Sequence, residues 1–353
     1  MSYKTQLEQI IDAVSAQGAS DLHLAVGHKP TVRVSSVLIP LVNFPELKKE
    51  DTEGLLGEIL TVENNKRFIE NKDLDFSYTT SSGVRFRGNA YYQMNVVGVA
   101  LRLITAKIKT LVELNLPPIL ADITNRKQGF FLVVGPVGQG KSTTLAAMVN
   151  MINQGRAEHV ITIEDPVEYI YPEGKSIVDQ REVRFDTADF HTALKSMFRE
   201  DVNVALIGEM RTPETISTAV TAAETGHLIF STLHTNNAAQ TIDRIIDSFP
   251  GTQQAQIRVQ LAGSLIGIFS QRLLPRISGG LVPAYELLLN NSAVSNLIRE
   301  GRTHEINMVL ETGSESGMID MNHSIAALVT SGEINAEDAF KYTLDPEALQ
   351  RLL

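Results

Sequence analysis

A glycine-rich segment between an apolar run and a helix-forming run constrains the fold of this chain more than any other feature. Residues 130–134 read Phe-Phe-Leu-Val-Val, the composition of a buried parallel strand, and residues 145–152 favour a helix with an apolar face. Between them, residues 135–142 read Gly-Pro-Val-Gly-Gln-Gly-Lys-Ser, the G-x-x-x-x-G-K-[ST] spacing of a phosphate-binding loop, or P-loop. This order predicts an α/β domain with a mainly parallel sheet.

Each position of the P-loop has a physical role in holding phosphate groups. Its glycines allow tight backbone turns that bring N–H groups against phosphate oxygens. Lys141 is expected to reach the β- and γ-phosphates of ATP, and the Ser142 hydroxyl to coordinate Mg²⁺, at the positive end of the following helix. The flanking strand and helix disfavour the alternative, a turn that binds nothing. The expected nucleotide-binding residues are Gly135, Pro136, Val137, Gly138, Gln139, Gly140, Lys141, Ser142 and Thr143.

Composition limits what else the chain can be. The net charge of −10 argues against nonspecific nucleic-acid binding over a broad surface, although it allows a locally basic channel. No apolar run approaches the ~20 residues of a membrane span, and the first residues form an amphipathic helix pattern rather than a signal peptide. The absence of cysteine excludes disulfides and thiolate metal sites. We therefore expect a cytoplasmic protein that binds no nucleic acid.

A chain of 353 residues suggests two or more domains. Residues 1–104 alternate helix and strand signals, as in a small α+β domain, and residues 105–118 contain Pro117-Pro118 and suggest an interdomain linker. Residues 119–353 are expected to form the P-loop domain. Beyond about residue 250 the strand signal fades, so a helical C-terminal region is expected, including a helix over 253–271. The expected strands of the P-loop domain are 130–134, 159–163, 203–207 and 227–232.

Acidic residues follow two of these strands. Glu164 and Glu168 come after 159–163, and Glu209 follows 203–207. In open α/β sheets the ligand binds beyond the carboxyl ends of the strands, so these carboxylates are expected near the nucleotide. Either Glu164 or Glu168 could orient the attacking water, and Glu209 could join the Mg²⁺ shell or polarise water. The alternative is a solvated acidic turn.

Two histidines flank the expected strand at 227–232. A histidine beside a phosphate site can hydrogen-bond the γ-phosphate and report its loss, a role expected for His234 and for His227. The alternative is a structural or exposed imidazole. Metal binding by the pair is not expected, because no third nitrogen, oxygen or sulfur ligand lies nearby in the sequence.

Arginines on strands of the first domain complete the expected set. NTPases often use an arginine to neutralise charge on the transferred phosphoryl group. If the chain forms a ring, Arg85, Arg87 and Arg102 could reach a neighbour's nucleotide. The alternative is that they form salt bridges on the surface of the sheet.

Four segments together resemble the secretion-superfamily ATPases of type II secretion and type IV pili. The P-loop matches the family's Walker A motif, and Ile-Thr-Ile-Glu-Asp-Pro-Val-Glu-Tyr at 161–169 matches its Asp box. Leu-Ile-Gly-Glu-Met-Arg at 206–211 matches its atypical Walker B, and Ser-Thr-Leu-His-Thr-Asn at 231–236 its His box. The resemblance runs nearly end to end. It implies a RecA-like ATPase domain preceded by a PAS-like domain.

Within this family the chain most resembles the retraction ATPases of type IV pili. It begins directly with the small domain, and residues 18–24 and 296–306 resemble the opening and C-terminal motifs of that group. Some positions depart from the family pattern. Val137 and Gln139 replace the usual Thr and Ser of the loop, and Ser295 replaces an Arg of the C-terminal motif.

The resemblance implies a homohexameric ring in the cytoplasm, docked at the inner membrane on a platform protein of the pilus machine. Each P-loop domain would pack against a neighbour's first domain, with ATP and Mg²⁺ between them, and hydrolysis would move the domains about the linker. Alternatives are an ATPase of pilus extension or type II secretion and an accessory retraction ATPase. A further alternative is a scaffold that binds ATP but barely hydrolyses it.

Overall fold

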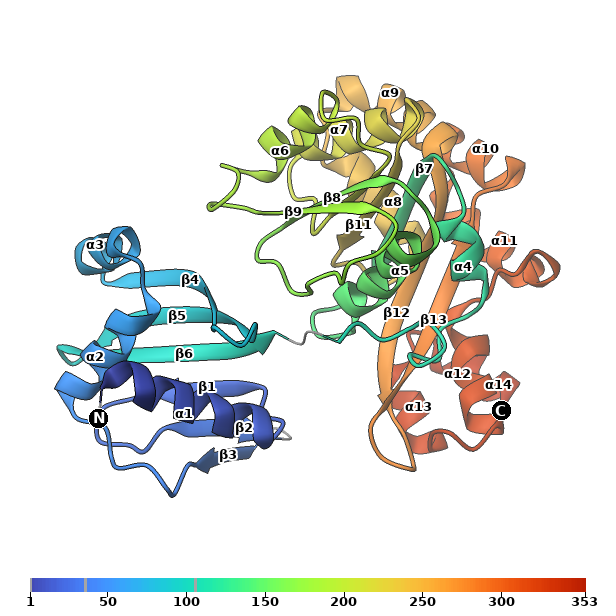
Figure 1. The fold of residues 1–353 in the computed structure, drawn as a ribbon. Helices are drawn as coiled ribbons and strands as arrows, with labels where there is room; N and C mark the ends of the chain where they lie inside the picture. The colour runs from blue at the N-terminus through green and yellow to red at the C-terminus, as the bar shows by residue number, and fades with distance from the viewer. Residues whose placement is uncertain (1, 35–36, 105–106) are drawn as a thin grey trace. The chain divides into compact units, whose positions relative to one another are not determined.

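The computed structural model describes residues 2–34, 37–104 and 107–353, which form two compact units, 1–107 and 108–353 (Figure 1). Residues 105–106 of the expected linker lie outside the described residues. Leu111 and Leu116, farther along that segment, are buried in the core of the second unit. Within the described ranges, none of the helices combines the length and the hydropathy that a membrane span requires.

The first unit is an antiparallel sheet with helices packed on one face. The strand order is β3-β2-β1-β6-β5-β4. The strands alternate in burial, because side chains at every second position point at the helices and the others point away. Its core joins Ile10 of α1 to Leu22 and Leu101 of the sheet. Its elements are α1 (Tyr3–Ala16), β1 (Asp21–Leu24), β2 (Thr31–Val34), β3 (Val37–Pro40), α2 (Lys49–Ile59), α3 (Val62–Asn71), β4 (Asp73–Thr79), β5 (Arg85–Gln93) and β6 (Val96–Ile104).

The second unit is built on a mainly parallel sheet of order β13-β12-β7-β11-β10-β8-β9, in which only the β12–β13 pair is antiparallel. The expected P-loop α/β fold is therefore confirmed. The strands are β7 (Gly129–Val134), β8 (His159–Glu164), β9 (Ile177–Glu182), β10 (Val204–Ile207), β11 (Leu228–Leu233), β12 (Leu265–Pro275) and β13 (Leu281–Leu289). The helices between them are α4 (Ile119–Thr124), α5 (Lys141–Gly155), α6 (Phe190–Met197), α7 (Pro213–Glu224), α8 (Ala238–Asp247) and α9 (Gly251–Ser264).

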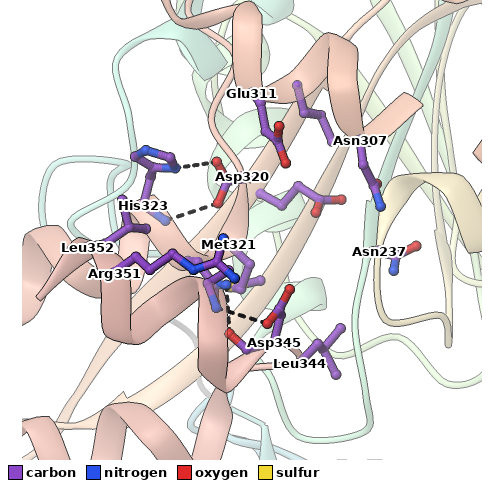
Figure 2. A pocket seen from close by; sticks show the side chains of 14 residues that line it. Asn237, Asn307, Glu311, Asp320, Met321, His323, Leu344, Asp345, Arg351 and Leu352 are labelled. Carbon is purple, nitrogen blue, oxygen red and sulfur yellow. Dashed lines mark hydrogen bonds and ion pairs between the residues drawn. The ribbon is translucent and has the colours of Figure 1, made fainter. Parts of the chain in front are cut away.

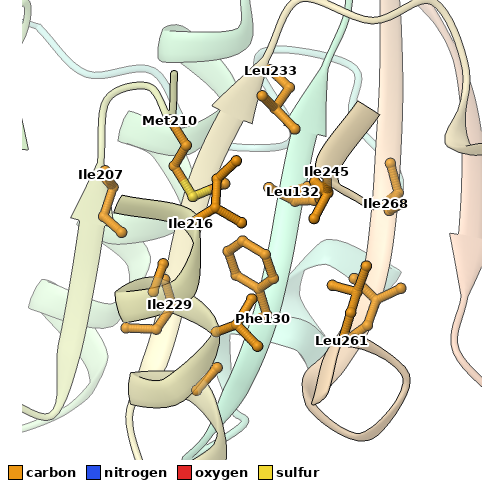
Figure 3. Close-up of a cluster of buried hydrophobic side chains, with 14 of the residues drawn as sticks. Phe130, Leu132, Ile207, Met210, Ile216, Ile229, Leu233, Ile245, Leu261 and Ile268 are labelled. Carbon is orange, nitrogen blue, oxygen red and sulfur yellow. The ribbon is translucent and has the colours of Figure 1, made fainter. Parts of the chain in front are cut away.

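Both faces of this sheet are covered, which explains why its central strands are continuously apolar. Phe130 and Leu132 of β7 pack with α6 to α9 on one face. Figure 3 shows them beside Ile216 of α7, Ile245 of α8 and Leu261 of α9. Phe131 and Val133 pack with α4 and α5 on the other. All six residues of β7 and all six of β11 are buried. The strand that leads into the P-loop is therefore held rigidly on both sides.

The expectation that helices dominate beyond residue 250 is wrong for residues 265–289. Helix α9 ends at Ser264, and the chain continues as β12 and β13. The apolar run from Leu265 to Phe269 fits a strand buried between β7 and β13, and β12 pairs with β7 in parallel. A helical region follows only after β13. Its helices are α10 (Ser292–Glu300), α11 (Ile306–Thr312), α12 (Met321–Thr330), α13 (Ala336–Tyr342) and α14 (Pro346–Leu352), with short 3₁₀ turns at Thr303–Glu305 and Ser314–Ser316.

Candidate active site

The carboxyl ends of four parallel strands meet at one edge of the second sheet. Val134, the last residue of β7, lies opposite Leu233 at the end of β11, and Ile207 of β10 lies opposite Ile163 of β8. The P-loop, His234, Glu209 and Glu164 follow these positions in the sequence. The sheet therefore brings the expected phosphate loop, one of the histidines and two of the acidic residues to the edge where α/β proteins bind ligands.

The P-loop has the backbone shape of an anion cradle. Helix α5 begins at Lys141, and its N-cap is Gly140, which adopts a left-handed conformation and has no side chain to satisfy the first N–H groups of the helix. Gly135 has a φ of 145°, and a Cβ atom there would lie 2.4 Å from the carbonyl oxygen of Gln271. Only glycine fits that position. These features suit a bound phosphate group.

Lys141 is buried at the centre of this cradle. Its Nζ donates hydrogen bonds to the carbonyl oxygens of Gly135 at 2.9 Å and Pro136 at 2.8 Å. Burial lowers the pKa of Lys141, while the charges of Glu168 and Glu209 act in the opposite direction. The carbonyl oxygens of the loop thus position the ammonium group beside the N-terminus of α5. Phosphate oxygens can replace these carbonyl oxygens as hydrogen-bond acceptors when a nucleotide binds.

His234 links Lys141 to Glu209. The Nδ1 atom of His234 lies 3.3 Å from Lys141 Nζ, and its Nε2 atom lies 3.9 Å from Glu209 Oε2. Burial and then the charge of Lys141 lower the pKa of His234, so the imidazole is neutral at neutral pH. An ammonium group can only donate, so Nδ1 must be the acceptor and Nε2 carries the proton toward Glu209.

Glu209 is the acidic residue that lies beside His234 and Lys141. Its Oε1 atom lies 2.8 Å from Arg211 Nη2, and its side chain is 18% exposed. Ser142 follows Lys141 in the first turn of α5. A hydroxyl and a carboxylate are the oxygen ligands that Mg²⁺ takes beside substrate phosphates, so these side chains fit the expected ion.

Glu164 and Glu168 differ sharply in their surroundings. Glu164 is buried, its Oε1 accepts the Thr162 hydroxyl at 2.6 Å, and its Oε2 accepts the Glu168 N–H at 3.4 Å. Burial raises the pKa of Glu164 to about 7, and these hydrogen bonds only partly offset that rise. Glu168 is exposed, and its charge acts on Lys141. Glu168 therefore has the more open position for contact with a substrate.

The raised pKa of Glu164 makes stability depend on pH. The folded form holds the proton up to about pH 7, whereas an unfolded carboxyl releases it near 4.5, so this stabilisation is present at low pH and lost as pH rises through 7. We expect wild type to lose on the order of 1–3 kcal/mol of unfolding free energy relative to Glu164→Gln between pH 5 and 8. Urea unfolding without nucleotide measures the difference. Parallel pH curves for the two proteins would refute the shift.

The expectation that His227 lies beside the phosphate site is wrong within its own subunit. His227 precedes β11, where its carbonyl accepts the N–H of Gly129 at the start of β7, and its ring packs edge-on against Phe198. Its Nδ1 lies 3.0 Å from the carbonyl oxygen of Ala222. Six strand residues separate His227 from His234, about 20 Å of extended chain. His227 therefore has a structural role at the amino ends of the strands, opposite the P-loop.

The three expected arginines belong to the first unit. Arg87 on β5 lies directly opposite Arg102 on β6, on the face of the sheet that points away from the helices. Arg102 Nε donates to Asp21 Oδ1 at 2.9 Å, although its side chain remains 70% exposed. Arg85 is half-buried, opposite Ile104. Like charges directly opposite each other destabilise a sheet, so the Arg87–Arg102 pair suits an anionic partner.

Sequence reasoning missed three residues that contact the site. The buried side chain of Gln271 on β12 binds Thr144 and the P-loop, and the Tyr169 hydroxyl lies 2.7 Å from Thr143 Oγ1. Arg211 pairs with Glu209. Tyr169 and Arg211 stand inside the Asp-box and Walker B segments, but Gln271 stands in a segment expected to be helical.

A separate pocket of about 320 Å³ lies among the C-terminal helices (Figure 2). Its lining includes Asp320 and His323 near the start of α12, Asp345 before α14, and the buried Glu286 of β13. Glu286 Oε1 accepts the N–H of Ala238 at the start of α8, and burial raises its pKa to about 7. None of the residues that line this pocket is among the expected site residues.

Comparison with known proteins places this site in context. A family model described as "Type II/IV secretion system protein" matches residues 3–280. The chain is 40% identical over 341 residues to the "Type IV pilus retractation ATPase PilT" of Pseudomonas aeruginosa, covering 97% of this chain and 99% of that protein. It is 39% identical to the "Type IV pilus ATPase PilU" of the same organism, covering 96% of this chain and 88% of the relative.

The fold is shared with solved structures over nearly the whole chain. A crystal structure of the pilus retraction motor PilT with bound ADP matches with a TM-score of 0.92 and 44% identity, covering 98% of each chain. The ATPase DotB of Legionella pneumophila matches in fold alone, with a TM-score of 0.83 at 23% identity over 96% of this chain and 95% of that one.

Proposed function

Because this chain belongs to the type II/IV secretion system protein family, we propose that it is the motor ATPase that drives retraction of type IV pili. One observation carries the proposal. The cluster of Lys141, His234 and Glu209 lies at the carboxyl edge of a fold that a retraction motor shares over almost its full length. The chain is an ATPase, and the ADP bound to the matched retraction motor is a precedent for nucleotide binding by this fold.

We propose the following division of labour among the residues. The N–H groups at the start of α5 and the Lys141 ammonium bind the phosphates of ATP and position the γ-phosphate. Ser142 and Glu209 hold Mg²⁺, which when bound neutralises charge on the phosphates. Glu168 or Glu164 orients the attacking water. His234 directs its Nε2–H toward Glu209 and senses the charge at the γ-phosphate position through Lys141.

We also propose that the protein works as a homohexamer in which the arginines act between subunits. The exposed Arg87 and Arg102 support this, since they lie opposite each other on β5 and β6 and two neighbouring arginines can bind a polyphosphate, although Arg102 also pairs with Asp21. Each subunit would present these arginines to the nucleotide of its neighbour. Loss of the γ-phosphate would then change the angle between the units, and a platform protein at the inner membrane would receive that motion.

The first unit offers a test of the arginine role. Arg102→Ala is expected to lower the ATP hydrolysis rate by about 100-fold or more while changing nucleotide binding much less, because the charge it neutralises grows in the transition state. Arg67→Ala on α3 is the matched control, since it removes an exposed arginine elsewhere in the same unit. Steady-state hydrolysis and nucleotide titration separate the two effects.

Mixed rings decide whether the arginine acts between subunits. A Lys141→Ala subunit keeps Arg102, and an Arg102→Ala subunit keeps its P-loop. If the arginine acts on a neighbour, mixing these two inactive proteins restores part of the ATP turnover. A mixture as inactive as its components would place Arg102 at its own subunit's site and overturn the ring proposal.

Deletion of the gene distinguishes retraction from the other candidates. Retraction predicts cells that carry pili but cannot withdraw them, whereas an extension ATPase predicts cells without pili. An accessory retraction ATPase is the second candidate, favoured by the similarity to PilU and by Ser295. Ser295 turns inward and donates to the carbonyl of Ala262, where the motif of retraction ATPases carries an Arg. An accessory role predicts that deletion weakens retraction without abolishing it.

A further inference from the structure

The buried side chain of Gln271 joins two parts of the phosphate site. Its Oε1 atom accepts the hydroxyl of Thr144, in the first turns of α5, at 2.7 Å. Its Nε2 atom donates to the carbonyl oxygen of Gln139, in the P-loop, at 2.8 Å. A carbonyl can only accept, which fixes the orientation of the Gln271 amide. Both amide ends of this 2% exposed side chain are therefore used on the nucleotide loop.

Gln139 returns the contact from the loop to the same strand. Its side-chain Oε1 accepts the backbone N–H of Leu273 at 2.6 Å. Gln139 stands at a loop position where the family usually has a shorter Ser, whose hydroxyl is two bonds closer to the backbone. The residues Gln139 and Gln271, with the N–H of Leu273 and the hydroxyl of Thr144, form a closed set of hydrogen bonds that we call the glutamine bracket.

The glycines of the loop show how closely β12 approaches. A Cβ atom at Gly135 would lie 2.4 Å from the Gln271 carbonyl oxygen, and one at Gly140 would lie 3.0 Å from Gln271 Nε2. Gly138, between them, has open space around it. The loop is thus held at both ends by β12 and left free at its tip, where a phosphate would enter.

We propose that the glutamine bracket holds the P-loop in its phosphate-binding shape before nucleotide arrives, so that Gln271 and Gln139 are positioning residues for the nucleotide. The inference rests on the proposed function, since it needs a nucleotide at the P-loop. A glycine-rich loop has many accessible backbone conformations, and ordering it on binding reduces affinity. The bracket supplies that order from β12, a strand hydrogen-bonded on both sides.

The glutamine bracket shapes the P-loop without contacting the phosphate groups themselves. It is therefore expected to stabilise bound substrate and transition state equally. Its loss is therefore expected to weaken nucleotide binding and raise KM while leaving kcat within about twofold. Gln271→Met keeps the length and packing of the side chain but removes both hydrogen bonds. We expect it to raise the Kd for a fluorescent ADP analogue about tenfold, consistent with the loss of two modest hydrogen bonds.

Variants at two further positions, Gln139 and Thr144, keep the test decisive if Gln271→Met folds poorly. Gln139→Ala removes the returning hydrogen bond from a half-exposed loop position and should also raise Kd. Thr144→Val removes the hydroxyl that fixes the Gln271 amide, whereas Thr144→Ser keeps it and should restore wild-type affinity. The Gln139→Ala/Gln271→Met double variant should weaken binding less than the sum of the single effects, because both act on one bracket.

Ser264→Ala is the matched control. It removes a buried hydroxyl-to-carbonyl hydrogen bond just before β12 begins, at the opposite edge of the sheet from the P-loop. It should lower thermal stability by an amount comparable to Gln271→Met without changing Kd. If Gln271→Met and Gln139→Ala lower thermal stability but bind the ADP analogue like wild type, the bracket is merely structural and the inference is overturned.

The titration also separates this inference from the proposed function. Wild-type protein that fails to bind the ADP analogue refutes nucleotide binding itself, and the bracket falls with it. Wild-type protein that binds, together with variants that bind equally well, refutes only the bracket.

Discussion

Replacing Lys141 with alanine is expected to lower ATP hydrolysis by about 100- to 1,000-fold, the usual cost of removing one preorganised donor to the reacting group. The ammonium group is buried among loop carbonyls and held toward His234, so no other side chain in the loop can replace it. Nucleotide binding should weaken as well, because a charge-assisted contact to the phosphates is lost. Phosphate-release assays and titration with a fluorescent ADP analogue measure the two effects.

Two companion variants test why Lys141 is needed. Lys141→Arg keeps the charge but should also be inactive, because a planar guanidinium cannot occupy the place of a compact ammonium between the carbonyls of Gly135 and Pro136. Lys195→Ala removes an exposed lysine from α6 and should hydrolyse ATP like wild type. Turnover of Lys141→Ala close to that of Lys195→Ala would show that the P-loop is not the hydrolytic site.

The second large effect is expected at Glu209. Glu209→Gln keeps the shape of the side chain and removes its charge, so the proposed Mg²⁺ site beyond the end of β10 loses its carboxylate ligand. We expect hydrolysis to fall about 100- to 1,000-fold. ATP binding should be retained or strengthened, because a negative charge beside the phosphates is gone.

Glu214→Gln is the matched control for this variant. Glu214 is exposed in the first turn of α7, five residues farther along the chain. It should leave turnover unchanged. Equal hydrolysis rates in wild type and Glu209→Gln would remove Glu209 from the catalytic set and favour a scaffold that binds ATP without using it.

The strand–loop–helix order of the P-loop was predictable because its signals are local. Phe130 to Val134 is an apolar run of β-prone residues that leads directly into the loop, and the glycine spacing of the loop is interpretable without tertiary contacts. The acidic residues and His234 were predictable for a similar reason. They directly follow apolar runs, and parallel strands bring their carboxyl ends together.

The strand β12 was not predictable in the same way. The run Leu265 to Phe269 follows helix α9 directly, and Gly263 and Ser264, which could signal a turn, still belong to that helix. An apolar run of this length suits a buried helix or a buried strand equally well. The pairing of β12 with β7 makes this run a strand, and that pairing joins segments more than a hundred residues apart.

The role of Gln271 was not predictable either, because Gln271 lies on β12. Its partner Thr144 lies 127 residues earlier in the sequence, and no local pattern connects them. His227 shows the opposite difficulty, because residues that are near in sequence can lie far apart in space. A six-residue strand between two histidines places them at opposite edges of the sheet.

The most direct test of the whole account links the site to pilus movement. Fluorescently labelled pili are followed by microscopy in cells whose own gene is deleted and which express either wild type or Glu209→Gln. We expect that pili extend in both strains, that they retract with wild type, and that they stay extended with Glu209→Gln. Retraction at the wild-type rate in the Glu209→Gln strain would contradict it.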